Sequence, residues 1–145
     1  MIRSAQACYD RFLYCDTDSL HVLGLEEPNI EIHQSELGYW KCEGIFSKAK
    51  YIRPKTYLET FVKKNGDIIT NPKEYSHDLE SETEVKCCGM PDNMKRLVSY
   101  DNFKLGQLYN NDMRAEDDDE NYAKLMPKTV KGGVVLVERD FHIKY

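Results

Sequence analysis

The chain has 145 residues, the size of one average domain or two small ones, and it is long enough to bury a hydrophobic core. Hydrophobic residues make up 41% of the chain and charged residues 31%, a composition that is typical of globular proteins and excludes a disordered chain. The formal net charge of −5 argues at first against a nucleic-acid partner, because nucleic-acid-binding proteins usually present net positive charge.

The charge is unevenly distributed along the chain. Between Lys41 and Lys64 there are seven basic residues and two acidic ones, whereas residues 112–120 hold six acids and one base. From Lys124 onward there are five bases and two acids. One acidic run therefore masks two basic segments, which the net charge alone does not reveal.

The cysteines and the apolar runs narrow the class of protein further. Five cysteines lack the spacing of a disulfide framework and no apolar signal precedes them, so reduced, intracellular thiols are expected. Adjacent Cys87 and Cys88 do not match C-x-x-C spacing and the histidines are scattered, so we expect no zinc site. The longest strictly apolar run, GVVLV, is too short to cross a bilayer, and no membrane partner is expected.

Residues 1–11 are expected to form a helix, because they contain helix formers and present Ile2, Ala5 and Tyr9 on one side. This helix has no convincing start, and a Met placed directly on the pattern suggests a chain cut from a longer one.

The segments RFLYC and SLHVLG predict two strands of a hairpin, since both are rich in β-branched, aromatic and aliphatic residues. Asp16, Thr17 and Asp18 then lie at or beside the turn. Residues i and i+2 of an extended chain point to the same side, so the two carboxylates are expected to project together. Such a pair needs a proton or a divalent cation between its charges, and Mg²⁺ takes oxygen ligands of this kind. The alternative is an ordinary polar turn.

Residues 39–69 predict long strands that turn near Gly44 and again at Asn65-Gly66. Within RPKTY, the residues Arg53, Lys55 and Tyr57 occupy alternate positions and would share one face of a strand. Two cations and a phenol side by side suit phosphate and sugar contacts, with a solvated strand face as the alternative.

The remaining segments predict shorter elements. Residues 70–82 are expected to be a loop, Pro91 to start a short helix, and SYDNFKLG to form another helix that ends at Gly106. The chain is expected to end in a hairpin, with one strand after Gly132-Gly133 and FHI as its partner. Apolar stretches in residues 12–62 exceed those after residue 89, which predicts the larger core in the first part.

Several segments together resemble a known family. AQACYDR, LYCDTDS, LGYW, AKYIRPKTY, VKCCGM, NFKLG and GGVVLV resemble, in order and spacing, the C-terminal part of family B DNA polymerases of the protein-primed branch, which small phages and linear plasmids carry. YCDTDS resembles motif C of that family, and KTY resembles its Lys-x-Tyr motif. The resemblance implies an α+β fold: residues 1–88 form part of a palm, an antiparallel sheet with a flanking helix, and residues 89–145 form a small thumb with short helices and a β-hairpin.

The resemblance also implies roles for individual residues. Asp18 is expected to be a direct ligand of two catalytic Mg²⁺ ions, or of Mn²⁺ in their place, and Asp16 to support metal and nucleotide binding. Tyr14 and Thr17 are expected near the incoming nucleotide. The residues expected to contact DNA are Lys55, Tyr57, Arg53 and Lys86.

The implied function is template-directed nucleotidyl transfer, with primer-template DNA, dNTPs and a terminal protein as primer, in the cytoplasm of a bacterial or phage-infected cell. The chain lacks the family's motifs A and B and its exonuclease motifs, so it is expected to be a fragment of a DNA-directed DNA polymerase and inactive alone. The acidic run is expected to be a solvated insertion in the thumb.

Two other functions stay open. One is a non-catalytic DNA-binding module or degenerate polymerase remnant that keeps the fold without the chemistry. The other is a metal-dependent phosphodiesterase that uses Asp16 and Asp18 with a further acid such as Glu43, although no general base for it is identifiable.

Overall fold

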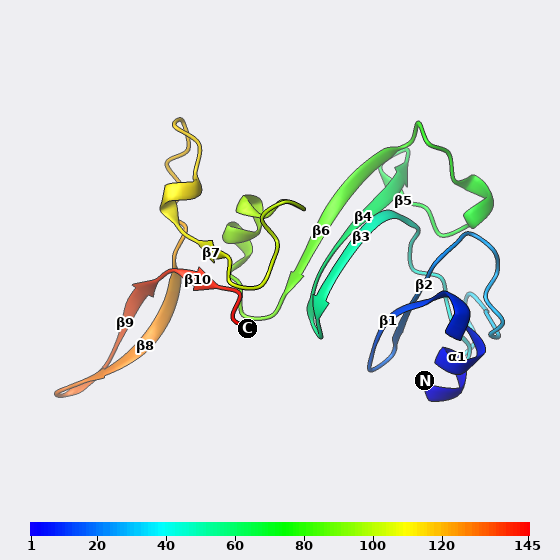
Figure 1. Ribbon diagram of the computed structural model, residues 1–145, viewed down its shortest axis with the longest axis horizontal. Helices are drawn as coiled ribbons and strands as arrows, with labels where there is room; N and C mark the ends of the chain where they lie inside the picture. Colours follow the sequence, from blue (N-terminus) through cyan, green and yellow to red (C-terminus); the bar gives the residue numbers. More distant parts are fainter. The chain divides into compact units, whose positions relative to one another are not determined.

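The computed structural model describes all 145 residues and consists mainly of antiparallel strands with short helices, so the predicted α+β class is confirmed (Figure 1). The chain divides into two compact units, Met1–Glu84 and Val85–Tyr145. This division lies close to the boundary predicted at residue 88, while the identities of the units as palm and thumb stay predictions.

The first unit begins with a short helix and the predicted hairpin. The helix is shorter than predicted and its apolar side is wrong, because Ile2 and Tyr9 are exposed while Cys8, where the helix gives way to a 3-10 turn, is 1% exposed. In the hairpin, Cys15 pairs with Leu20 and Asp16 with Ser19. The elements are α1 (Ile2–Ala7), η1 (Tyr9–Arg11), β1 (Phe12–Asp16) and β2 (Ser19–Val22).

A four-stranded sheet follows, and its long strands curve side by side (Figure 1). Its last strand in the sequence, β6, begins in this unit and ends in the second. The strand β4 is central and pairs with β3, β5 and β6. Leu58 and Val62 lie four residues apart and are buried on one face of β4, whereas Glu59 is buried on the opposite face. The elements are β3 (Phe46–Arg53), β4 (Thr56–Lys64), β5 (Asp67–Ile68), η2 (Pro72–Glu74) and β6 (Glu80–Cys87).

Of the two turns predicted for this sheet, one is confirmed and one is wrong, and a third turn lies where a strand was predicted. The Asn65-Gly66 turn is confirmed and joins β4 to β5. RPKTY is not one strand, however, because the chain turns at Pro54-Lys55 between β3 and β4. The predicted turn near Gly44 is also wrong: β3 begins at Phe46, and Gly44 instead packs tightly against the Phe61 ring and Ile68.

The second unit is built from short elements around a compact core. Met94, Phe103, Tyr109 and Ile143 are each fully buried, and most of the buried apolar residues of the chain lie in this unit, so the prediction of a larger core in the first part is wrong. Its elements are η3 (Asp92–Leu97), β7 (Leu108–Tyr109), η4 (Asn111–Met113), β8 (Lys124–Val130), β9 (Gly133–Arg139) and β10 (Phe141–His142).

Two predictions for this unit are corrected. Residues 99–106 form turns and no helix, because the side chains of Ser99 and Asn102 bond each other's backbone N–H groups. The C-terminal hairpin joins β8 to β9, whereas Phe141 of β10 pairs with Tyr109 of β7. The 3-10 helix after Pro91 agrees with the predicted short helix.

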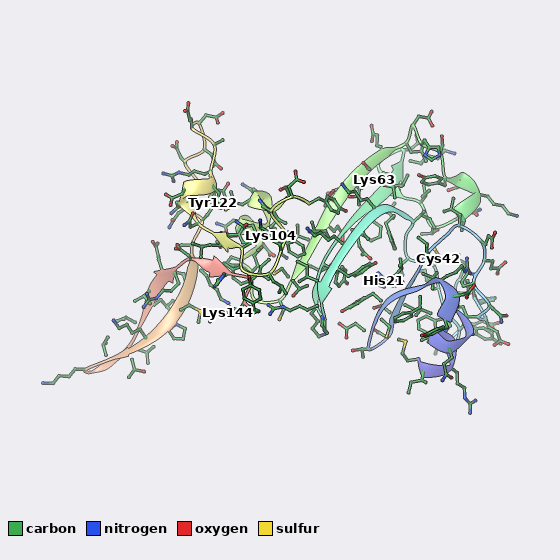
Figure 2. The ribbon with its side chains drawn as sticks, in the orientation of Figure 1. His21, Cys42, Lys63, Lys104, Tyr122 and Lys144 are labelled. Atoms are coloured by element: carbon green, nitrogen blue, oxygen red, sulfur yellow. The ribbon has the colours of Figure 1, made fainter.

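The acidic run lies on the surface, which agrees with a solvated insertion. Most of its residues are exposed, and it is held at its base by Tyr122, which is 2% exposed and donates its hydroxyl to Asp118 (Figure 2). Asn93 bonds Glu120 from η3 at 3.1 Å. No helix of this chain has the length and apolar character needed to cross a membrane.

Candidate functional site

The turn of the first hairpin places two aspartates in different surroundings. Asp16 is the last residue of β1, Thr17 has a φ of 46°, and Ser19 begins β2. The Ser19 hydroxyl donates to the Asp16 carbonyl oxygen at 3.1 Å, and the Thr17 hydroxyl donates to the Asp16 carboxylate at 3.1 Å. Asp16 is half-buried, whereas Asp18 is exposed. The i, i+2 alternation stops at Asp16, because the chain at Thr17 is not extended.

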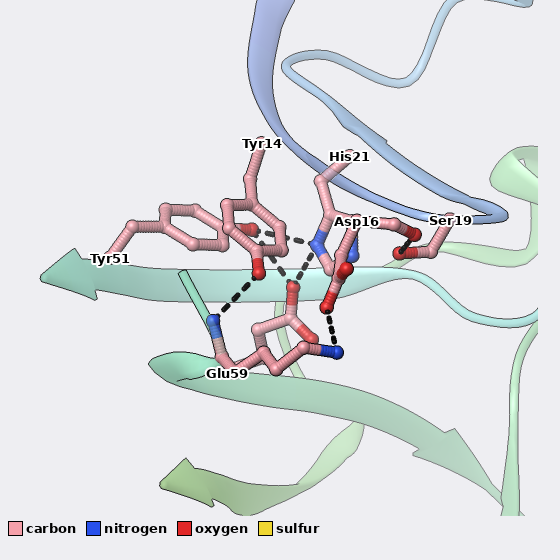
Figure 3. Close-up of polar contacts among 7 residues, drawn as sticks. Tyr14, Asp16, Ser19, His21, Tyr51 and Glu59 are labelled. Atoms are coloured by element: carbon pink, nitrogen blue, oxygen red, sulfur yellow. Dashed lines mark hydrogen bonds and ion pairs between the residues drawn. The ribbon is translucent and has the colours of Figure 1, made fainter. Parts of the chain in front are cut away.

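The second turn, Pro54-Lys55, meets this hairpin through two contacts. The Lys55 ammonium lies 2.9 Å from the Asp16 carboxylate, and the Lys55 backbone N–H donates to the Tyr14 hydroxyl at 2.9 Å (Figure 3). The Lys55 hydrogen bond, followed by that of Thr17, holds the pKa of the Asp16 carboxyl below its ordinary value. The structure therefore brings YCDTDS and KTY together, although they are far apart in the sequence.

The backbone at Lys55 has an unusual conformation. Its φ is 59°, in the left-handed region that favours glycine, and Pro54 suits the preceding turn position. Arg53 lies across the turn and donates from Nε to the Thr56 hydroxyl at 3.3 Å. Because a turn separates them, Arg53, Lys55 and Tyr57 do not share one strand face, which corrects the prediction.

Aromatic rings surround the predicted nucleotide-binding residue Tyr14. Its ring stacks on Tyr51 at 5.2 Å between centroids and with 15° between planes, and it lies 4.9 Å from the Tyr57 ring. His21, its partner across the hairpin, meets the Tyr14 ring edge-on at 5.3 Å. Burial raises the pKa of Tyr57 to about 12, assisted by the carboxylate of Glu59. Tyr14 is thus held on three sides.

A buried carboxylate beneath these rings escaped the sequence analysis. Glu59 is 3% exposed, and its Oε1 accepts a hydrogen bond from the Tyr51 hydroxyl at 2.8 Å and contacts His21 Nδ1 (Figure 3). The available signal was a glutamate in the middle of an otherwise apolar and β-branched strand, TYLETF, where a charge is costly without partners.

The metal-binding capacity of this site is partial. The carboxylate oxygens of Asp16 and Asp18 have the donor chemistry that Mg²⁺ prefers. Yet the chain has no group of three or more Asp, Glu, His or Cys residues that could hold an ion. Glu43 therefore does not complete a site with the two aspartates, and the phosphodiesterase hypothesis gains no support.

The remaining predicted DNA-binding residue is Lys86. It is exposed on β6 and belongs to the second unit.

Comparison with known proteins gives relatives along almost the whole chain. No family model matches it. The chain is 43% identical over 148 residues to the DNA polymerase of Bacillus phage Nf, 40% over 149 residues to that of Bacillus phage phi29, and 32% over 144 residues to that of Streptococcus phage Cp-1. These alignments cover 99% of this chain but only 23%, 23% and 21% of the relatives, so the chain spans under a quarter of their length.

Solved structures give the same result. A phi29 DNA polymerase complexed with primer-template DNA matches 99% of this chain with a TM-score of 0.77 at 40% identity, and the match covers 24% of that polymerase. The ternary complex with primer-template DNA and incoming nucleotides matches with a TM-score of 0.75 and covers 23% of its chain. The predicted resemblance to phage DNA polymerases is confirmed.

Proposed function

We propose that this chain, a homologue of a segment of phi29-type phage DNA polymerases, is the C-terminal palm and thumb portion of a protein-primed family B DNA-directed DNA polymerase. The observation that carries the proposal is the junction of the two turns. Lys55 of KTY contacts both Asp16 and Tyr14 of YCDTDS, within a chain whose relatives along 99% of its length are DNA polymerases.

Asp18 and Asp16 would hold the catalytic Mg²⁺ ions, with Mn²⁺ as the alternative. When bound, two such ions activate the primer 3′-hydroxyl and neutralise the triphosphate in in-line nucleotidyl transfer. The exposed Asp18 is free of the ion pair that engages Asp16, which suits it to be the main ligand. The other ligands would come from the part of the polymerase that this chain does not match.

The surrounding residues would position the substrates. Tyr14 and Thr17 would lie near the incoming dNTP, and Lys55 and Tyr57 near the primer end. The Lys55 side chain is 62% exposed, so its ammonium can leave the Asp16 carboxylate for a primer phosphate. Arg53 and Lys86 would contact the duplex. A terminal protein would supply the priming hydroxyl, and replication would take place in the cytoplasm of a bacterial or phage-infected cell.

The experiment that tests this proposal is primer extension by the longer polymerase that carries this segment. Asp18→Asn keeps the side-chain shape but removes the charge, so we expect extension to fall by at least about a hundredfold. Its matched control is Asp67→Asn, an exposed aspartate beside another hairpin turn, which should extend at the wild-type rate. A near-normal rate for Asp18→Asn would overturn the site.

DNA binding measured beside primer extension separates the polymerase from a non-catalytic DNA-binding module or polymerase remnant. Lys55→Ala should weaken binding to primer-template DNA and reduce the slope of log affinity against log salt by about one. Asp18→Asn should bind DNA as the wild type does. A longer wild-type protein that binds DNA but does not extend a primer would favour the DNA-binding module or polymerase remnant instead.

A further inference from the structure

We propose that Glu59 is a positioning residue for the candidate site: through Tyr51 and His21 its buried carboxylate orients the Tyr14 ring and anchors the aspartate-bearing hairpin to the sheet. The role assigned to Tyr14 in nucleotide binding rests on the proposed function. The geometric part of the proposal does not, because it concerns contacts within this chain alone.

One carboxylate oxygen of Glu59 joins three strands. Glu59 lies on β4, Tyr51 on β3 and His21 on β2. Oε1 of Glu59 accepts from the Tyr51 hydroxyl at 2.8 Å and contacts Nδ1 of His21, and that nitrogen lies 2.9 Å from the same hydroxyl. The three groups close a triangle that links the hairpin to the sheet (Figure 3).

Both partners of Glu59 also contact Tyr14. The Tyr51 ring stacks on the Tyr14 ring, and the His21 ring meets it edge-on. A tyrosine ring in a strand can rotate about its side-chain bonds unless its neighbours are fixed. Because Glu59 fixes the polar ends of both neighbours, it sets the surface against which Tyr14 rests. The Tyr14 hydroxyl in turn accepts a hydrogen bond from the Lys55 backbone N–H and so connects the hairpin to the second turn.

Burying the carboxylate of Glu59 is energetically costly. A carboxylate whose side chain is 4% exposed loses its hydration and is retained only with good partners, whereas an apolar side chain would fill the same space without that loss. An apolar side chain, however, makes no directional hydrogen bonds, so it cannot hold a hydroxyl and an imidazole at set angles. The polar triangle therefore suits a place where ring orientation has a functional consequence.

Nuclear magnetic resonance of the 145-residue chain tests the geometric part. The Tyr14 ring protons should be shifted by the stacked Tyr51 ring, and Glu59→Leu should move them towards the values of an exposed tyrosine. Glu59→Gln keeps an acceptor for Tyr51 and a polar group for His21, so it should retain the wild-type shifts. Unchanged Tyr14 shifts in a folded Glu59→Leu chain would overturn the proposal.

Two further variants distinguish a loss of ring orientation from a loss of stability. Val62→Ala removes a buried side chain from the same strand without touching the triangle, so it should lower stability but leave the Tyr14 shifts unchanged. Tyr51→Phe removes only the hydroxyl donor, and it should loosen the Tyr14 ring even if Glu59→Leu does not fold. A rigid Tyr14 ring with its wild-type chemical shifts in Tyr51→Phe would contradict the proposed role of the triangle.

Steady-state kinetics of the longer polymerase test the functional part. Glu59→Leu should raise the KM for dNTP about tenfold with a smaller change in kcat, and Glu59→Gln should restore the KM to within about twofold. An equal rise in KM for Val62→Ala would mean that stability alone is responsible, and would overturn the positioning role. Absence of extension by the wild type would defeat the proposed function and the nucleotide-binding role of Tyr14, while the resonance data would still decide the geometry.

Discussion

Lys55 has a backbone conformation that glycine adopts more easily than any other residue, and this makes a sharp prediction about stability. Its φ of 59° brings the side-chain Cβ close to its own backbone, a cost that glycine does not have. Lys55→Gly and Lys55→Ala both remove the ammonium and its contact with Asp16. The difference between the two variants therefore measures the backbone alone.

We expect Lys55→Gly to be more stable than Lys55→Ala by about 1 kcal/mol, the usual cost of a left-handed conformation for a residue with a Cβ. Urea unfolding followed by tryptophan fluorescence measures it. The single tryptophan, Trp40, lies in the same unit as Lys55 and donates to the Ser4 hydroxyl at 3.0 Å, so its emission should change when this unit unfolds.

Lys48 provides the matched control. It is an exposed lysine within β3, and its backbone is not among those with positive φ. At this position alanine should be more stable than glycine by about 0.5–1 kcal/mol, because glycine loses more conformational freedom in a strand. An alanine variant at Lys55 that is as stable as the glycine variant would refute the strain argument. Both Lys55 variants should weaken DNA binding equally, since neither carries the cation.

Two further predictions concern the same unit. Gly44→Ala should destabilise the chain by about 1–3 kcal/mol in urea unfolding, because the new Cβ would lie 2.8 Å from the Phe61 ring and 2.9 Å from Ile68; the loss should shrink in a Phe61→Leu background, and equal losses in both backgrounds would contradict this. Folding raises the pKa of Tyr57 from 10.0 to about 12. Because the phenol ionises at a lower pH in the unfolded chain than in the folded chain, the free energy of unfolding should fall as the pH rises through this window. Tyr57→Phe should make that fall shallower than the exposed-site control Tyr9→Phe does, and identical pH profiles for the two variants would count against it.

Local chemistry explains which parts of the fold the sequence could predict. The first hairpin follows from two β-rich runs around a polar turn, and the turn between β4 and β5 follows from Asn65-Gly66, whose residues tolerate positive φ. The order and spacing of the chain's motifs predicted the resemblance to phage DNA polymerases, because both are properties of the sequence itself. Asp16 and Lys55 were both singled out in this way.

The errors arose where a residue's conformation depends on distant partners. RPKTY alternates as a strand does, and only the Tyr14 hydroxyl and the Asp16 carboxylate, some forty residues earlier, account for a lysine at the turn. Gly44 resembles a turn glycine in sequence, but the space taken by Phe61 and Ile68 is what excludes a side chain there.

The sequence by itself determined the hairpin, the polar turn with its two aspartates and the motifs that identify the chain's relatives, because each depends on neighbouring residues or on their order. Only the tertiary structure decided that Glu59 lies under Tyr51 and His21. It also decided that Phe141 pairs with Tyr109, so that β9 pairs with β8 and not with β10. A buried carboxylate is stable only when donors from other strands reach it, and a strand's partner is chosen by the core that both strands share. Neither condition can be predicted from the residues that neighbour Glu59 or Phe141 in the sequence.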